Sequence, residues 1–137
     1  MISLLDTADH YPLDAWVVFR NLPGDEDRKW YIRPLREGFK HVEVWVRDGG
    51  VWIRMDPCFE IPVLEAYLGE PISHIDPLLK PTFFRVRKPI LSRMLKAPWV
   101  VGPVTCVEAV KLVLCIRKAW IKTPYQLYTY LRKTKGI

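Results

Sequence analysis

The most regular pattern of hydrophobic and polar positions is FKHVEVWVRDGGVWIRMDP (39–57), where the two classes alternate on either side of Asp-Gly-Gly. Such alternation is typical of strands with two unlike faces, and Asp-Gly favours a two-residue hairpin turn. If Asp-Gly forms the turn, His41 lies opposite Asp56. If Gly-Gly forms it, the partners shift by two positions and the faces stay the same. We predict a β-hairpin with one aliphatic face and one face that carries His41, Glu43 and Asp56.

Shorter apolar runs predict the other elements. Strands are expected at 15–20, 29–35 and 82–88, a short helix at 61–69, one or two helical turns at 89–96, and helices at 105–120 and 123–135. The last helix opens with a capping box, in which Thr123 is the N-cap, Pro124 the first helical residue and Gln126 the partner. Strands followed by segregated helices indicate an α+β fold in a single domain, residues 1–137.

A cysteine stands where the first of the two long helices is expected to begin. The segment TCVE (105–108) fits a capping box with Thr105 as the N-cap and Cys106 as the first helical residue. The helix dipole and free backbone N–H groups at that point favour a thiolate, the nucleophilic form of cysteine. The competing interpretation is that Cys106 is a small buried hydrophobic residue.

The two cysteines of this helix are expected to face in different directions. On a helical wheel Cys106 lies on the apolar face, and Cys115 is turned about 180° from it. The outward side also carries Glu108, Lys111 and Lys118.

A nucleophilic cysteine needs a base, and the base needs a group that orients it. We prefer His41 as the base, because His10 lies near the chain terminus and His74 in a proline-rich segment. Asp56 would hold one tautomer of His41 and stabilise its imidazolium, and Glu43 on the same face is the second candidate. The competing interpretation is a polar cross-strand pair on a solvated sheet face.

The packing of the hairpin decides whether the histidine can reach the cysteine. If the aliphatic face packs on the helix of Cys106, His41 points away from the thiol unless it reaches around the strand end. If Trp45 and Trp52 lie under the helix instead, His41 and Cys106 lie in the same layer.

Composition excludes several classes of protein. Of the 137 residues, 50% are hydrophobic and 26% charged, which is ordinary for a globular domain. No apolar run reaches the roughly 18 residues of a membrane span, and the N-terminus lacks the pattern of a secretory signal. Three cysteines without a C-x-x-C pair favour neither a disulfide framework nor a zinc site, so we expect no metal and no cofactor. The expected location is the cytoplasm or a virion.

Charge is divided unevenly along the chain. Residues 1–76 contain 8 Lys/Arg and 14 Asp/Glu, whereas residues 77–137 contain 13 Lys/Arg and one acidic residue, Glu108. A basic half is able to attract nucleic acid, a membrane surface or an acidic protein. Because the basic residues are dispersed, we favour the alternative in which the two halves fold together and partly neutralise each other.

Three segments together resemble a known superfamily. They are GFKHVEVWV (38–46), VWIRMDP (51–57) and GPVTCVEAVKLVL (102–114). They are similar to the circularly permuted papain-like cysteine hydrolases, a branch of the NlpC-type cell-wall peptidases related to the lecithin retinol acyltransferase group. In that branch the histidine strand precedes the cysteine helix, and the order His41, Asp56, Cys106 matches. The TCVE helix followed by TPYQLYTYL is also similar to small proteins of tailed phages.

The resemblance implies a papain-like α+β fold, in which a small antiparallel sheet packs against a central helix that starts at the cysteine, plus a C-terminal helix. It implies Cys–His hydrolase or acyltransferase chemistry, with peptidoglycan stem peptides as the substrate class. The chain departs from the family pattern by carrying Glu43 where a small residue is usual, and its Asp56 lies farther from the histidine than the third residue usually does.

Three functional hypotheses follow. In the first, the protein is a cysteine hydrolase in which Cys106 attacks a peptide or peptidoglycan carbonyl, His41 moves the proton and Asp56 orients His41. In the second, it is an inactive papain-like scaffold that serves as a structural or accessory phage virion protein and binds other tail proteins. The third, ranked lowest, is a nucleic-acid binder that uses the basic half. Its stacking groups would be Phe83, Phe84, Tyr125 and Tyr128.

Overall fold

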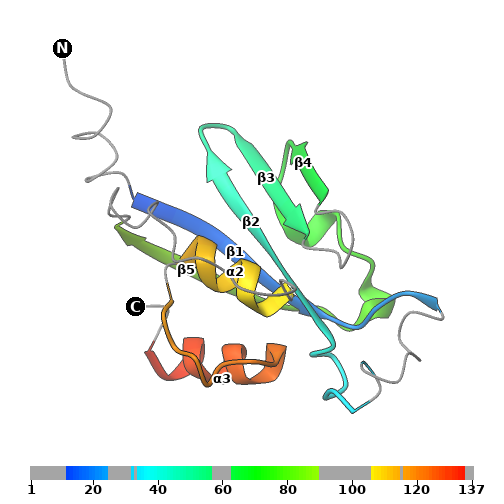
Figure 1. Cartoon of the computed structure of the whole chain (residues 1–137). Helices are drawn as coiled ribbons and strands as arrows, with labels where there is room; N and C mark the ends of the chain where they lie inside the picture. Colours follow the sequence, from blue (N-terminus) through cyan, green and yellow to red (C-terminus); the bar gives the residue numbers. More distant parts are fainter. Residues whose placement is uncertain are drawn as a thin grey trace.

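In the part of the chain that the structure describes, the fold is an antiparallel β-sheet with two helices on one face (Figure 1). The computed structural model describes residues 12–24, 32, 34–56, 63–89, 106–114 and 116–134. The strands are β1 (Pro12–Arg20), β2 (His41–Asp48), β3 (Val51–Asp56), β4 (Val63–Tyr67) and β5 (Thr82–Pro89), in the spatial order β4-β3-β2-β1-β5. Two short 3-10 helices, η2 (Pro71–Ser73) and η3 (Pro77–Leu79), connect β4 to β5, and the helices α2 (Cys106–Leu114) and α3 (Pro124–Thr134) follow. The α+β class is confirmed.

The helices cover the aliphatic face of the sheet. Alternate residues of β1 and β2, among them Val17 and Val44, are fully buried against them. Strands offer every second residue to one face and helices offer a stripe of every third or fourth, so both patterns meet in one apolar core. The buried members of this core are Leu13, Ala15, Val17, Phe19, Val42, Val44, Val86, Val107, Val110, Leu114, Ile116, Ile121, Leu127 and Leu131.

The opposite face of the sheet carries a second, smaller core. Val18, Trp45 and Trp52 are buried there together with Ile75, which comes from the connection between η2 and η3. This connection covers part of the face that is turned away from the helices. The middle of the sheet is therefore buried on both sides, and polar residues on the second face, such as Glu43, are enclosed within the protein.

The hairpin turns at residues 49–50, because Asp48 pairs with Val51. The first turn residue is a glycine with φ +62°, a left-handed conformation that glycine adopts without strain. The two faces are as predicted, and the register is the Gly-Gly alternative, shifted by two positions from the Asp-Gly one. His41 and Asp56 are therefore diagonal neighbours across the two strands, a separation that long polar side chains still bridge.

Two predicted elements in the first half are wrong. Where a helix was predicted at 61–69, the described residues contain β4 (Val63–Tyr67), which pairs with β3. Pairing with the free edge of β3 satisfies the backbone of this segment, and such tertiary context overrides local propensity. In the strand predicted at 29–35, the described residues lie in turns and bends, and the N–H of Leu35 donates to the carbonyl of Ile32 at 2.9 Å.

The helical turns predicted at 89–96 lie outside the described residues, apart from Pro89 at the end of β5. The helix predicted at 105–120 begins at Cys106 and ends at Leu114. Thr105 and Cys115 are outside the described residues, so the capping box and the orientation of Cys115 stay predictions.

Lys111 was expected on the outward side of α2, and this expectation is wrong. Its side chain is buried, and its Nζ donates to the carbonyl of Ile121 at 3.0 Å and lies 3.1 Å from Glu108 Oε1. The chain after α2 returns across the helix and covers this position. A buried ammonium is tolerated there because it satisfies a carbonyl of the returning chain.

The start of α3 confirms the predicted capping box. The Thr123 hydroxyl accepts a hydrogen bond from the N–H of Gln126 at 3.2 Å, and Gln126 Oε1 accepts one from the N–H of Thr123 at 3.1 Å. Pro124 is the first helical residue, where its missing N–H carries no cost.

Removal of this cap should destabilise the protein. Thr123→Ala deletes the acceptor for the N–H of Gln126, so we expect the free energy of unfolding in urea to fall by about 1 kcal/mol. Thr129→Ala is the matched control, because Thr129 lies on the exposed side of the same helix, and it should change the free energy by less than about 0.5 kcal/mol. Equal losses in the two variants would contradict the role of the cap.

Candidate functional site

Cys106 is the first residue of α2, as predicted, and its thiol is free and half-buried. The beginning of α2 lies beside the beginning of β2 (Figure 1). The side chain packs at the margin of the main core without being enclosed in it. The thiol therefore differs from the fully buried hydrophobic residue of the competing interpretation.

His41, the first residue of β2, links the cysteine to the sheet. Its side chain is buried, and its Nε2 lies 2.5 Å from Asp56 Oδ1. The side chain of His41 also hydrogen-bonds to that of Cys106. The aliphatic face of the hairpin packs on α2, so the histidine reaches the thiol around the strand end. The polar pair is not solvated, contrary to the competing interpretation.

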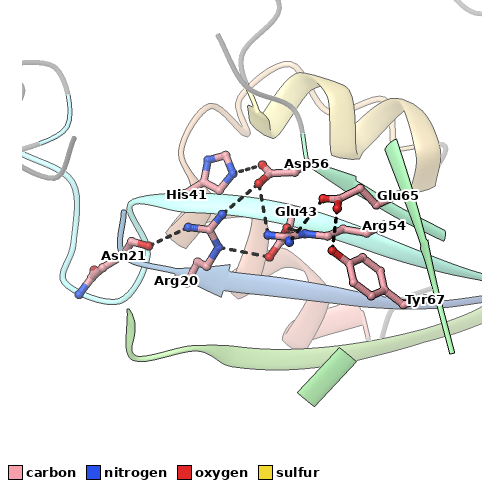
Figure 2. A network of polar contacts seen from close by, with 8 residues as sticks. All are labelled: Arg20, Asn21, His41, Glu43, Arg54, Asp56, Glu65 and Tyr67. Carbon is pink, nitrogen blue, oxygen red and sulfur yellow. Dashed lines mark hydrogen bonds and ion pairs between the residues drawn. The ribbon is translucent and has the colours of Figure 1, made fainter. Parts of the chain in front are cut away.

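Asp56, the last residue of β3, uses its two oxygens for different partners. Oδ1 faces His41, whereas Oδ2 lies 3.1 Å from Arg20 Nη2 and 3.4 Å from Arg54 Nη2 (Figure 2). Two guanidinium groups thus hold Oδ2 of the carboxylate, and Oδ1 faces the imidazole of His41.

Glu43 belongs to the same network but points to other partners. Its carboxylate is fully buried, with Oε1 3.2 Å from Arg20 Nε and Oε2 2.6 Å from Arg54 Nε (Figure 2). Of the two candidates for the third residue, the structure brings Asp56 to His41 and engages Glu43 with the arginines.

The surroundings of His41 change its proton affinity. Burial alone would lower its pKa, but the hydrogen bonds to Asp56 and Cys106 and the negative charges of the same two residues outweigh burial and raise the pKa to about 9. Burial likewise acts to raise the pKa of Asp56, yet the hydrogen bond to His41 and the charges of His41, Arg20 and Arg54 lower it overall. A protonated His41 facing an ionised Asp56 is the expected state at neutral pH.

Arg20 is the main residue that sequence reasoning missed. It is the last residue of β1, is buried, and pairs with His41 across β1 and β2. The available signal was its parity with Trp16 and Val18 in the run AWVVFR, which assigns it to the polar face of the hairpin once β1 is known to lie beside β2.

The other candidate residues lie elsewhere. His74 is exposed, its Nε2 donates to the carbonyl oxygen of Leu68 at 3.1 Å, and its ring lies against those of Trp45 and Tyr67. His10 and Cys58 are outside the described residues. The four proposed stacking groups are half-buried and pack with the two cores or with other aromatic rings: Phe83, Phe84, Tyr125 and Tyr128.

Within the described ranges, no group of three or more His, Cys, Asp or Glu side chains is arranged to hold a metal ion. None of the helices in the described part of the chain has the length and apolar composition of a membrane span.

No protein-family model, curated protein or solved structure matches the chain.

The titration of His41 tests the geometry directly. By NMR of ¹³C-labelled histidine, we expect the imidazolium of His41 to persist through neutral pH and to lose its proton at about pH 9. Asp56→Asn removes a negative charge and weakens the hydrogen bond while burial remains, so the midpoint should move to lower pH by about one unit or more. A midpoint that Asp56→Asn leaves unchanged would contradict the pairing.

Proposed function

We propose that this protein is a cysteine hydrolase of the amidase or peptidase type with a permuted papain-like domain. The observation that carries the proposal is the buried His41, whose side chain hydrogen-bonds to Asp56 through Nε2 and also to Cys106. A nucleophile, a base and a carboxylate that orients the base form the arrangement used for covalent hydrolysis. The histidine strand also precedes the cysteine helix along the chain, which is the order in the permuted superfamily.

The first half of the reaction transfers an acyl group to the enzyme. The Cys106 thiolate attacks the carbonyl carbon of the substrate and forms a C–S bond, and the carbonyl oxygen becomes an oxyanion. Backbone N–H groups at the start of α2 are suited to stabilise that charge. The C–N bond then breaks as His41 donates its proton to the leaving amine, which leaves a thioester on Cys106.

The second half returns the enzyme to its starting state. Neutral His41 takes a proton from a water molecule, whose oxygen attacks the thioester carbonyl. The C–S bond breaks, a carboxylic acid leaves, and Cys106 is again a thiolate beside protonated His41. Asp56 stays ionised throughout and holds Nε2–H, so that the same ring nitrogen faces the sulfur in both halves.

Thiol reactivity is the first test of this proposal. Iodoacetamide at pH 6 should label Cys106 faster than the other two cysteines, because an ordinary thiol is almost fully protonated at that pH. His41→Ala should slow the labelling of Cys106 roughly tenfold or more, since it removes the cation that stabilises the thiolate. The rate is read by mass spectrometry of the modified peptides.

Two controls accompany the labelling. His74→Ala removes an exposed histidine outside the site and should leave the rate unchanged. Cys58 and Cys115 provide reference thiols within the same chain. Slow labelling of Cys106 that is indifferent to His41→Ala would sink the enzyme proposal.

Substrate cleavage is the second test. With peptidoglycan stem peptides as the substrate, chromatography with mass detection should find new amine and carboxylic acid ends for the wild type. Cys106→Ala should abolish them, because no other described residue can form the thioester. Cleavage that persists in Cys106→Ala would exclude this nucleophile.

The second candidate function is an inactive papain-like scaffold that assembles with other proteins, such as those of a phage tail. The observation that favours it is a set of exposed aliphatic side chains between β4 and η3, which are 67% to 85% exposed. They are Leu64, Leu68, Ile72 and Leu78. Exposed apolar groups of this kind often mark a protein contact. The labelling experiment separates the two candidates, because a scaffold has no need of a reactive thiol.

A further inference from the structure

The partners of Asp56 suggest a role for residues behind the catalytic pair. Arg20 and Arg54 contact Asp56 Oδ2, the oxygen turned away from His41, and the same two arginines contact Glu43 (Figure 2). The two carboxylates and two guanidinium groups thus form a group of zero net charge, and Arg54 Nη1 also lies 3.9 Å from Oε1 of Glu65 at its outer edge. The network spans β1, β2 and β3 and ends at the imidazole.

We propose that Arg20 is a positioning residue for the Cys106–His41 pair: it fixes the Asp56 carboxylate against the imidazole and, with Glu43, balances the charge of that carboxylate. The inference rests on the proposed function for its catalytic meaning. Arg20 itself does not touch the reacting atoms, because its described side-chain contacts are with Asp56, Glu43 and the carbonyl of Asn21.

The geometry of Arg20 explains why an arginine stands at this position. Its Nε lies 3.2 Å from Glu43, its Nη2 3.1 Å from Asp56, and its Nη1 3.1 Å from the Asn21 carbonyl. Three N–H groups of one rigid planar fork therefore point at three fixed acceptors. A lysine would carry the same charge, but its single ammonium on a flexible stem would not hold these acceptors in one plane.

The charge balance has a consequence for proton transfer. His41 faces Asp56 and Cys106 directly, with Arg20, Glu43 and Arg54 one contact further away. Removal of the positive charge of Arg20 or Arg54 favours the imidazolium of His41. Removal of the negative charge of Glu43 favours the neutral imidazole. Charge-changing variants of Arg20 and Glu43 should thus move the titration of His41 in opposite directions, which a merely structural role would not produce.

The test is the NMR titration of His41 in a series of full-length variants. Arg20→Gln should raise the midpoint by about one pH unit, and Glu43→Gln should lower it by about one unit. The double variant Arg20→Gln/Glu43→Gln removes one charge of each sign, so its midpoint should return to within about half a unit of the wild type. Arg85→Gln is the matched control: Arg85 pairs with Asp14 in a separate ion pair, and its loss should leave the midpoint unchanged.

Arg20→Lys separates charge from geometry. It keeps the positive charge, so the midpoint should not rise as it does in Arg20→Gln, and it should slow the labelling of Cys106 at pH 6 about tenfold, because the carboxylate is no longer held in place. Wild-type labelling in Arg20→Lys would overturn the positioning role.

An unchanged midpoint in Arg20→Gln would overturn the charge balance. If Arg20→Gln does not fold, Glu43→Gln provides the test. An unchanged midpoint in Glu43→Gln would also overturn the charge balance. The titration requires neither substrate nor a reactive thiol, so shifted midpoints together with slow wild-type labelling would leave the network intact and reject the hydrolase.

Discussion

The structure depends on keeping charged side chains paired inside one face of the sheet. Glu43 is fully buried, and an unpaired carboxylate in that place would cost several kcal/mol. Arg20 and Arg54 each contact one of its oxygens and also reach Asp56. Because these residues come from β1, β2 and β3, a slip of one residue in any of the three strands would turn a charge toward the apolar core and leave its partners alone. The ion pairs therefore fix the alignment of the central strands.

The same alignment joins the two layers of the fold. His41 stands at the beginning of β2, where the strand gives way to a loop and its side chain can reach around the sheet. Cys106 begins the helix that packs on the other face, and the start of that helix lies beside the start of β2. The Asp56 carboxylate consequently lies on the buried side of His41, and the half-buried Cys106 thiol lies on the more exposed side. In the dry region the hydrogen bonds of Asp56 are stronger than they would be in water.

The parts of the site that local pattern determines could be read from the sequence. Alternation assigned His41 and Asp56 to one face of the hairpin under either turn, and the helix start at Cys106 followed from turn and capping residues. The contacts of Arg20 could not be read, because they depend on which strands are neighbours, and strand order is not a local property. The same holds for β4, which is a strand because β3 offers it an edge, and for Lys111, which is buried because the chain returns across α2.

The ionised carboxylate that faces His41 explains the buried charges better than a gain in stability does. Apolar residues of similar volume often stabilise a core as well as an ion network does, or better. What apolar residues cannot do is hold a carboxylate ionised against an imidazole. If the charge of Asp56 were unbalanced in the dry interior, it would bind the proton of His41 still more tightly, and a stronger base is a poorer acid. The two arginines moderate that effect while keeping the hydrogen bond, and Glu43 pairs with both of them. In the proposed reaction, such a histidine both retains a proton beside the Cys106 thiolate and releases it to the leaving amine.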